Sequence, residues 1–302
     1  MEPSAVIAFT LLRGFPKTVM AISVSDVTDK VAVDLSGAAQ TMLATLYLKA
    51  LDADFSHPVL GDQFAKQAVE RLDYDFPTIG VGAAWAPLIT VRTALYDVWA
   101  RQFLAAHPDC TVIHLGCGMD ARVFRLNPGP HVHWYDVDYP DVVALRERVY
   151  PARPSYELLG TAATDLSWLQ RIPTGRPTLL LAEGISMYLT AEDGAALLRA
   201  VVDRFGTGEV QIDFYNWLGV KSQSRQALVR ATGSTLHWAV NSPASVLRAV
   251  PELRLLIATT LSGAVTLRRA SLGPRTLARL TRAVPPVRDA LQYHRYAFGP
   301  VI

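Results

Sequence analysis

Hydrophobic positions along the chain follow two different periods. Between residues 37 and 106 the apolar residues recur three and four positions apart, as in AAQTMLATLYLKALDA and LYDVWARQFLAAH, which predicts amphipathic helices. From residue 110 onward, short apolar runs such as CTVIHL, PTLLLAEG and EVQIDFY alternate with helical stretches such as PDVVALRERVY. Alternation of this kind is typical of βαβ units. The pattern therefore predicts a helical front end followed by a doubly wound α/β sheet that is mainly parallel.

A glycine turn follows the first apolar run of the predicted sheet. In LGCGMDARVF, Gly116 and Gly118 lie between a strand and a helical stretch. Missing side chains let a ligand approach the main chain, and the free N–H groups at a helix start favour a negative or electron-rich group. Together with Ala121 the two glycines fit the loose G-x-G-x-x-G/A dinucleotide pattern. The turn is also compatible with an ordinary strand-to-helix connection.

Carboxylates end the next predicted strand, HWYDVDYPD. Asp136 and Asp138 share one strand face because side chains alternate with a period of two, while Asp141 follows a proline and is typical of a helix N-terminus. A carboxylate at the end of such a strand can accept hydrogen bonds from ribose hydroxyls. We assign this role to Asp138, which lies nearer the strand end.

The amino-acid composition limits the class of binding partner that we expect. The chain has 302 residues, of which 50% are hydrophobic and 19% charged, with a formal net charge of +2. A large core can form in one compact body, and electrostatics give no reason to expect a nucleic-acid partner. The expected partner is a small molecule in a pocket.

The cysteines and the N-terminal segment indicate the cellular compartment. Two cysteines are too few for a disulfide framework, which favours the cytoplasm. The apolar N-terminal segment is interrupted by Arg13, Pro16 and Lys17, well short of the roughly 18 apolar residues of a membrane span. It also lacks the basic leader of a secretory signal, so we expect neither membrane insertion nor secretion.

Four segments together resemble a known family. LGCGMDARVFRL, WYDVDYPDVVALR, ATDLSWL and LLLAEGISMYL are similar to the successive cofactor motifs of class I S-adenosylmethionine-dependent methyltransferases. Within that class they resemble the branch of leucine carboxyl methyltransferases and tetracenomycin-type polyketide O-methyltransferases. DLSGAAQTMLATLYLKALDA and TLHWAVNSP resemble the polyketide group as well. The resemblance covers roughly residues 34 to 300.

The resemblance implies an architecture. It implies a Rossmann-like sheet of seven strands in which the last, within YHRYAFGPVI, runs antiparallel. A helical cap over residues 34–106 would cover the cofactor, and residues 107–302 would form the S-adenosylmethionine-binding core with substrate-lid insertions. We recognise no family counterpart for residues 1–33. We describe them as an N-terminal extension, whose apolar arm would be able to pack on a second subunit of a homo-oligomer.

The resemblance also implies contacts with the nucleoside part of S-adenosylmethionine. Asp138 would hold the ribose hydroxyls, and the backbone at Gly116 and Gly118 would pass beside the methionine moiety. Asp165 in ATDL would accept a hydrogen bond from the adenine amine, and Leu166 would supply a backbone N–H and an apolar contact. Asp165 is equally suited to capping a helix N-terminus.

Two further residues are implied at the methionine end of the cofactor. Arg92 in TVRTALYD would pair with the methionine carboxylate, and Glu183 in LAEG would lie near the amino group and the methyl-transfer site. Without the resemblance, Arg92 would be read as a surface helix charge and Glu183 as a polar strand end. His131 and His133 lie on one strand face without a third ligand at fitting spacing, so we expect no metal site.

The sequence says least about the methyl acceptor. The resemblance implies O-methylation of a small aromatic or polyketide-derived molecule, and we expect methyl-ester formation at a carboxyl group, with a phenolic hydroxyl as the alternative. A carboxylate is ionised at neutral pH, whereas a phenol with a pKa near 10 profits from a general base. His237, beside Trp238 as an aromatic surface, is the candidate catalytic residue.

Two other classes share part of the pattern. An NAD-dependent oxidoreductase would have the glycine turn and the strand-end acid, but about 110 residues precede the glycines here, and ATDL and AEG have no evident nicotinamide role. A non-catalytic cofactor-binding protein also stays open, because binding motifs alone do not prove turnover.

Overall fold

The computed structural model describes residues 30–33, 39–225 and 235–300 of the chain. Most of the predicted N-terminal extension, residues 1–29, lies outside the described residues. Within them, no helix has both the length and the apolar character needed to cross a membrane.

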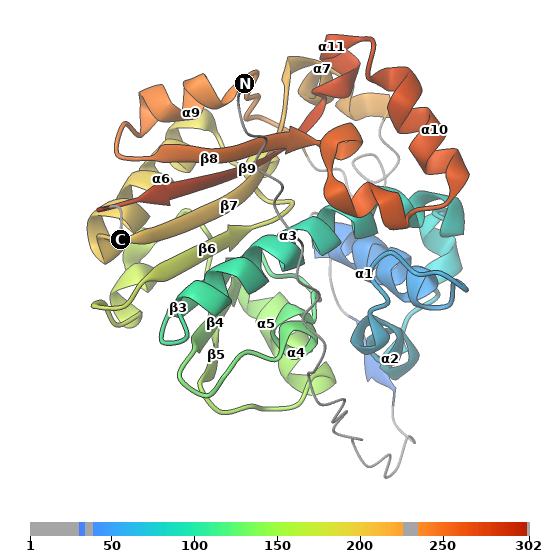
Figure 1. Cartoon of the computed structure of the whole chain (residues 1–302). Helices are drawn as coiled ribbons and strands as arrows, with labels where there is room; N and C mark the ends of the chain where they lie inside the picture. The colour runs from blue at the N-terminus through green and yellow to red at the C-terminus, as the bar shows by residue number, and fades with distance from the viewer. Residues whose placement is uncertain (1–29, 34–38, 226–234, 301–302) are drawn as a thin grey trace, which may run out of the picture.

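A seven-stranded sheet forms the centre of the molecule, in the order β5-β4-β3-β6-β7-β9-β8 (Figure 1). β9 runs antiparallel to both β7 and β8, and the pairs among β3 to β7 are parallel. The strands are β3 (Thr111–Leu115), β4 (His133–Asp138), β5 (Tyr156–Gly160), β6 (Thr178–Ala182), β7 (Gly208–Tyr215), β8 (Arg254–Thr260) and β9 (Leu291–Phe298). The predicted seven-stranded, mainly parallel sheet with an antiparallel last strand is confirmed.

The strand order reverses between β3 and β6. From β3 the chain proceeds outward to β4 and β5, then returns to β6 on the other side of β3. Connections that leave two neighbouring strands in opposite directions open a crevice at the carboxyl ends of those strands. The fold therefore places its main ligand crevice beside the glycine turn that follows β3.

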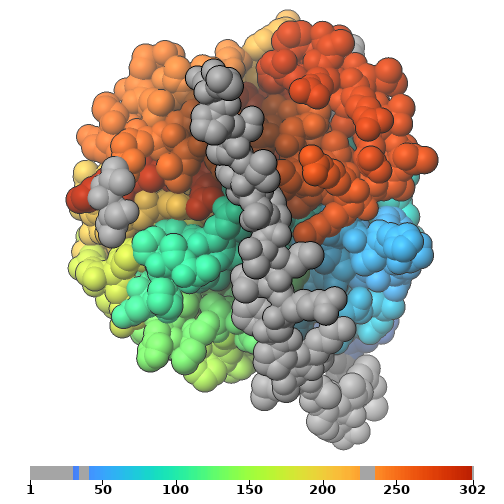
Figure 2. All heavy atoms as spheres, viewed as in Figure 1, coloured from blue at the N-terminus to red at the C-terminus, as the bar shows by residue number. Residues whose placement is uncertain are grey.

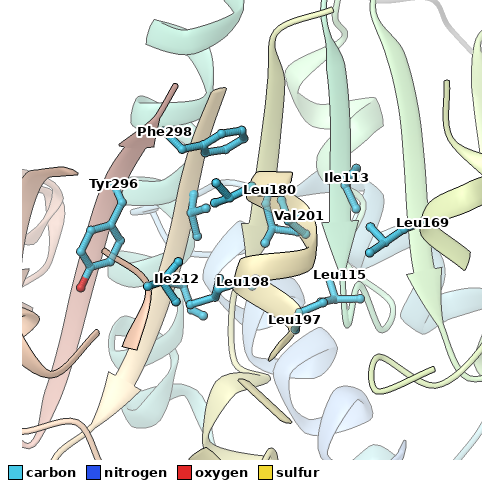
Figure 3. Packing of buried hydrophobic residues seen from close by; sticks show 14 of the residues in the cluster. Ile113, Leu115, Leu169, Leu180, Leu197, Leu198, Val201, Ile212, Tyr296 and Phe298 are labelled. Carbon is cyan, nitrogen blue, oxygen red and sulfur yellow. The ribbon is translucent and has the colours of Figure 1, made fainter. Parts of the chain in front are cut away.

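One face of the sheet is covered by α6 (Ala191–Phe205), η3 (Leu166–Arg171) and α9 (Pro243–Ala249). The apolar positions of α6 recur three and four residues apart, so they form one stripe that packs on the sheet. Figure 3 shows these contacts. The side chains that meet there come from the sheet and from α6: Ile113, Leu115, Leu180, Ile212, Leu197, Leu198 and Val201.

The other face is covered by α3 (Ala86–Ala106), α4 (Arg122–Leu126) and α5 (Pro140–Val149). Of the 21 residues of α3, 13 are buried, which is typical of a helix enclosed on several sides. It shares a hydrophobic cluster with β3 and β6 and also contacts α1. Figure 1 shows it lying along the sheet. Although the sequence placed α3 in the cap, it belongs to the layered core as well.

The rest of the cap consists of α1 (Ala39–Ala53), α2 (Gln63–Arg71) and the short helices η1 (Phe76–Ile79) and η2 (Ala83–Trp85), with a two-stranded parallel sheet of β1 (Val31–Ala32) and β2 (Leu72–Asp73). Buried Asp52 accepts hydrogen bonds from the backbone N–H groups of Val59, Leu60 and Gly61 at 3.1, 2.9 and 3.0 Å. These three bonds from the Asp52 carboxylate to backbone groups fix the loop between α1 and α2.

Two insertions lie between the last strands. The connection after β7 contains α7 (Trp217–Lys221) and η5 (Gln223–Arg225). The connection between β8 and β9 contains η6 (Leu261–Gly263), η7 (Val265–Arg269), α10 (Leu272–Thr281) and α11 (Pro285–Arg288). Whether either insertion acts as a substrate lid stays a prediction, as do the domain boundaries at residues 33 and 106.

Trp238 fills a gap that only a glycine leaves open. A Cβ atom on Gly194, in the first turn of α6, would lie 2.0 Å from Cζ3 of the Trp238 ring. The indole is 6% exposed and packs edge-on against Phe214, with the ring centroids 4.9 Å apart. The expectation that Trp238 offers an aromatic surface to a ligand is therefore wrong, because its ring belongs to the hydrophobic core.

Replacing this glycine should destabilise the protein although alanine is the better helix former. We expect Gly194→Ala to lower the free energy of unfolding by roughly 1 to 3 kcal/mol, the usual cost of overpacking a core, against a propensity gain of about 1 kcal/mol. Urea denaturation measures the difference. Gly273→Ala in α10 is the matched control, since nothing lies within 4 Å of its Cβ position. Equal effects of the two substitutions would contradict the packing argument.

Candidate functional site

A cavity of about 380 Å³ lies at the carboxyl ends of β3, β4 and β6. Its walls come from α1, the turn after β3, the ends of β4 and β6, η4 (Ser186–Tyr188) and the segment around Leu236. The sequence-predicted residues Arg92, Gly116, Gly118, Asp138, Glu183 and His237 all line it. The cavity thus brings together residues that are up to 145 positions apart because the strand order reverses at this point.

The glycine turn forms the floor of the cavity. Gly116 and Gly118 have φ angles of 63° and 49°, a left-handed conformation that costs other residues energy. A Cβ on Gly116 would lie 2.7 Å from Cδ1 of Ile185, and one on Gly118 would lie 3.0 Å from Cβ of Met42. Both glycines are therefore required by backbone conformation and by the closeness of the opposite walls.

Asp138 and Asp136 have different surroundings although they share a strand face. Asp138 reaches the cavity, where its carboxylate accepts the N–H of Gly118 at 2.7 Å and that of Tyr139 at 2.8 Å. Burial raises the pKa of Asp138, and these two backbone bonds oppose the increase. Asp136 is fully buried below the turn and does not line the cavity.

Asp136 belongs to a network that supports the turn from beneath. It pairs with Arg146, accepts a hydrogen bond from Tyr156 at 2.7 Å, and lies 3.2 Å from His114 Nδ1. Arg146 in turn donates to the carbonyl groups of Gly118 and Asp120 at 2.6 and 3.0 Å. Burial alone would raise the pKa of Asp136, but Arg146 and His114 hold it below its ordinary value. The carboxylate thus fixes the backbone on which the cavity floor depends.

Glu183 is held by cations on both sides. Arg92 Nε and the Thr93 hydroxyl donate to its Oε1 at 2.9 and 2.7 Å, and Arg122 donates to its Oε2. Burial raises the pKa of this carboxyl group, but Arg122 and Arg92 outweigh that effect and lower it to about 2. Glu183 is therefore an anion at neutral pH.

Arg92 has a second buried partner that the sequence did not indicate. Its Nη1 lies 2.9 Å from Oδ2 of Asp213, whose Oδ1 accepts the backbone N–H of Gly184 at 2.7 Å. Asp213 lies on β7, 121 positions after Arg92. Arg92 is consequently a buried link between α3, β6 and β7 that also faces the cavity, rather than a surface helix charge.

A further ion pair closes the cap over the cavity. Lys49 on α1 lies 3.1 Å from Asp120 in the glycine turn, and the two side chains are 6% and 7% exposed. Asp120 also contacts Arg122 and Arg125 at 3.3 and 3.0 Å. Coulombic attraction from these cations overcomes burial and holds the pKa of Asp120 well below its ordinary value. The sequence did not indicate this pair: Asp120 lies in the glycine turn, but its partner Lys49 is 71 positions away and lies in no motif.

Asp165 and Leu166 are not brought to the cavity. Asp165 is exposed at the N-terminus of η3, where its Oδ1 accepts the N–H of Ser167 at 3.1 Å, and its pKa is lowered chiefly by the bonds to Ser167. Leu166 packs against the core cluster. The preceding residues Thr161, Ala163 and Thr164 line the cavity instead. The adenine contacts of Asp165 and Leu166 stay a prediction.

A further part of the cavity wall is mainly apolar and carries two tyrosines, which lie near enough to Arg92 and Asp213 to interact with their charges. Met187 and Leu236 are buried together, and Tyr188, Tyr215 and Val220 pack against them. Burial raises the pKa of Tyr188 above its ordinary value and that of Tyr215 to about 12. Both phenols therefore stay protonated at neutral pH and can donate hydrogen bonds.

His237 lies at the rim of this wall. Its backbone N–H donates to the carbonyl group of Met187 at 2.8 Å, and its side chain is exposed. Among the residues that the structure describes, the imidazole has no hydrogen-bond partner. The same part of the chain contains no group of three or more His, Cys, Asp or Glu side chains suited to a metal ion.

Known proteins that are similar to this chain are methyltransferases. A model of the leucine carboxyl methyltransferase family matches residues 27–202. The tetracenomycin polyketide synthesis O-methyltransferase TcmP of Streptomyces glaucescens is 38% identical over 266 residues, which span 88% of this chain and 98% of that protein. The S-adenosyl-L-methionine-dependent methyltransferase dpfgK of Gibberella zeae is 33% identical over 248 residues, or 75% and 83% of the two chains.

A solved structure shares the fold at much lower sequence identity. A DUF574 family protein from Streptomyces avermitilis superposes with a TM-score of 0.55 at 11% identity and covers 84% of this chain and 97% of its own. The family model matches more than half of this chain, and the similarity to TcmP extends along nearly the whole of that protein. This chain therefore belongs to the leucine carboxyl methyltransferase family.

Proposed function

We propose that this S-adenosylmethionine-dependent O-methyltransferase forms a methyl ester on a carboxyl group of a small aromatic or polyketide-derived acceptor. The observation that carries the proposal is the cavity that the glycine turn, Asp138 and the Glu183 ion pairs line together with two protonated tyrosines. The relatives TcmP and dpfgK, an O-methyltransferase of polyketide synthesis and an S-adenosyl-L-methionine-dependent methyltransferase, support the cofactor and the reaction type.

The residues of the cavity fit S-adenosylmethionine. Asp138 retains acceptor capacity beyond its two backbone bonds, since an ionised carboxylate has about four lone-pair sites, and we assign the ribose hydroxyls to it. The left-handed glycines leave the backbone accessible beside the methionine chain. We assign the methionine carboxylate to Arg92 and its ammonium group to Glu183. When bound, the cofactor supplies an electrophilic methyl group on a sulfonium.

The charges around the cavity favour a cationic ligand. The connected network contains five carboxylates and four cationic side chains, namely Asp62, Asp97, Asp120, Glu183, Asp213, Lys49, Arg92, Arg122 and Arg125. With all of them ionised, five negative and four positive charges give the network a net charge of −1 in a mostly buried region. A ligand that carries an ammonium and a sulfonium would complement it.

The cavity wall that carries the two tyrosines supports a carboxyl acceptor. The protonated hydroxyls of Tyr188 and Tyr215 can donate to carboxylate oxygens, while Met187 and Leu236 offer apolar contact to a ring. Neither tyrosine is suited to remove a proton at neutral pH, because burial raises both pKa values. A carboxylate needs no base; alignment and exclusion of water are sufficient for its in-line attack on the methyl group.

The phenolic alternative rests on His237. Its side chain is at the rim of the cavity, so a substrate hydroxyl could come within its reach. A general base is usually oriented by a third group, and the described residues supply none to this imidazole. We therefore favour the carboxyl acceptor, assign His237 to acceptor binding, and propose the cytoplasm as the compartment, in keeping with two cysteines that are both free and buried.

Loss of the Asp138 carboxylate should weaken cofactor binding. Each hydrogen bond to a charged group contributes about 1.5 to 3 kcal/mol, so we expect the Kd of S-adenosylhomocysteine to rise roughly tenfold or more in Asp138→Ala, measured by calorimetry. Asp141→Ala is the control, because Asp141 is exposed in the first turn of α5 and bonds only to its neighbour Val142. An unchanged Kd in folded Asp138→Ala would refute the assignment.

Removing the Tyr215 hydroxyl should affect the acceptor and not the cofactor. We expect Tyr215→Phe to raise the acceptor KM roughly tenfold, as for one lost bond to a carboxylate, with the Kd of S-adenosylhomocysteine unchanged. Tyr293→Phe is matched to it, since the Tyr293 hydroxyl is buried without a hydrogen-bond partner in the described residues. A change in cofactor affinity without a change in KM would reverse the assignment of the two walls.

The pH profile distinguishes the two acceptor chemistries. With a carboxyl acceptor, we expect kcat to stay nearly flat above about pH 6, where the carboxylate is already ionised, and His237→Ala to act mainly on KM. A phenolic acceptor would give a rate that rises with pH, and His237→Ala would lower kcat roughly a hundredfold or more. Mild alkaline hydrolysis of the product is decisive: an ester is cleaved, whereas a product that resists is an ether and contradicts the carboxyl proposal.

A further inference from the structure

A second cavity of about 350 Å³ lies in the insertion between β8 and β9. It shares no residue with the methyl-transfer cavity. Its lining consists of Ser262, Gly263, Ala264, Val265, Leu267, Arg268, Arg275, Ala278, Arg279 and Arg282. Four of these ten residues are arginines and none is acidic. Arg275 and Arg279 lie on α10, Arg282 is its C-cap residue, and Arg268 lies on η7. Figure 1 shows α10 at the end of the molecule that also carries α1, and Figure 2 shows the orange and red atoms of this insertion on the surface.

The four arginines have no compensating charge. In the described part of the chain, none of their guanidinium groups takes part in an ion pair or a hydrogen bond, whereas neighbouring Arg269 donates to the carbonyl group of Val59 and Arg288 pairs with Asp289. No Asp or Glu occurs in residues 253–288. Four like charges around one hollow repel one another, and no carboxylate of the described residues pairs with them to reduce this repulsion.

The orientation of α10 makes this arrangement unusual. Arg275, Arg279 and Arg282 are spaced four and three apart and therefore share one helix face, which is the face that lines the cavity. Leu277 and Leu280 lie on the opposite face and are 56% and 70% exposed. A surface helix normally turns its apolar face inward and its charges outward. Here the arginines border an open surface hollow, with Arg275 half-buried and Arg279 and Arg282 exposed. The leucines face outward on the other side of the helix, and an anion in the hollow would explain why the arginines gather around it.

We propose that this cavity binds a compact polyanion of the phosphate class, either free or as the phosphate group of an ester. The planar guanidinium group forms paired hydrogen bonds to phosphate oxygens, and a group with two or more negative charges offsets more of the repulsion than one carboxylate does. The volume lies within the usual range for small-ligand sites, about 300 to 1,000 Å³. Val265 and Leu267 in the wall offer contact to the organic part of an ester.

The cavity is joined to the rest of the protein at the start of α3. The hydroxyl of Thr266 on η7 donates to the carbonyl group of Val91 at 2.7 Å, and Val91 precedes Arg92. The wall of the arginine cavity is thus fixed to the helix that also faces the methyl-transfer cavity. The proposal does not depend on the reaction at that cavity.

Calorimetry with sodium pyrophosphate tests the proposal on the full-length protein. We expect saturable one-to-one binding, weakened at least tenfold in Arg275→Gln/Arg279→Gln and further weakened by salt, because the contacts are charge-assisted hydrogen bonds. Arg148→Gln/Arg248→Gln is the matched control: it removes the same net charge from exposed arginines of α5 and α9. Its affinity for pyrophosphate should equal that of the wild type.

Further arms separate the ligand sources and guard against misfolding. Tighter binding of hexyl phosphate than of inorganic phosphate would identify an ester site, and equal binding a site for free phosphate. The affinity for S-adenosylhomocysteine should be unchanged in Arg275→Gln/Arg279→Gln, which would show that this double variant is folded. If the double variant does not fold, Arg282→Gln takes its place, because Arg282 is at an exposed position. Absence of saturable pyrophosphate binding, or an equal loss in the Arg148→Gln/Arg248→Gln control, would overturn the proposal.

Discussion

Desolvation of Glu183 is the constraint on which most of this structure depends. A buried carboxylate without partners is unfavourable by several kcal/mol, and here it is compensated by Arg92 and Arg122, which reach it from α3 and α4. Those cations are paired in turn with Asp213 on β7 and with Asp97 and Asp120. The network fixes the distance between the sheet, the helix packed on it and the glycine turn, so the shape of the cavity follows from charge compensation as much as from hydrophobic packing.

The two sides of the main cavity are built on different principles. On one side, backbone atoms and ion pairs define positions closely, since Gly118, Asp138 and Arg146 are joined by hydrogen bonds of 2.6 to 2.7 Å. On the other side, Met187 and Leu236 meet through apolar contacts that do not set direction. The side with defined positions suits a ligand that is the same molecule in every turnover. An apolar side can adapt to ligands of different shapes.

Local patterns predicted the fold because strands and helices differ in their hydrophobic period, and they predicted the glycine turn and Asp138 because a strand end and a turn are adjacent in sequence. The ion pairs were not predictable in this way. Lys49 and Asp120 are 71 positions apart, and Arg92 and Asp213 are 121 apart, so only the folded chain reveals their partners. Trp238 was misassigned because its neighbour in space is Gly194, which leaves no signal near the tryptophan in sequence.

The burial of α3 on several sides has a consequence for motion. A helix that shares one cluster with the sheet and also contacts α1 cannot move with the cap unless it leaves the core. Its amide hydrogens are therefore expected to exchange only when large parts of the molecule open, while segments with fewer buried contacts fluctuate at lower free energy. Any segment around the cavity that moves when a ligand binds would therefore move against α3 as the stationary part.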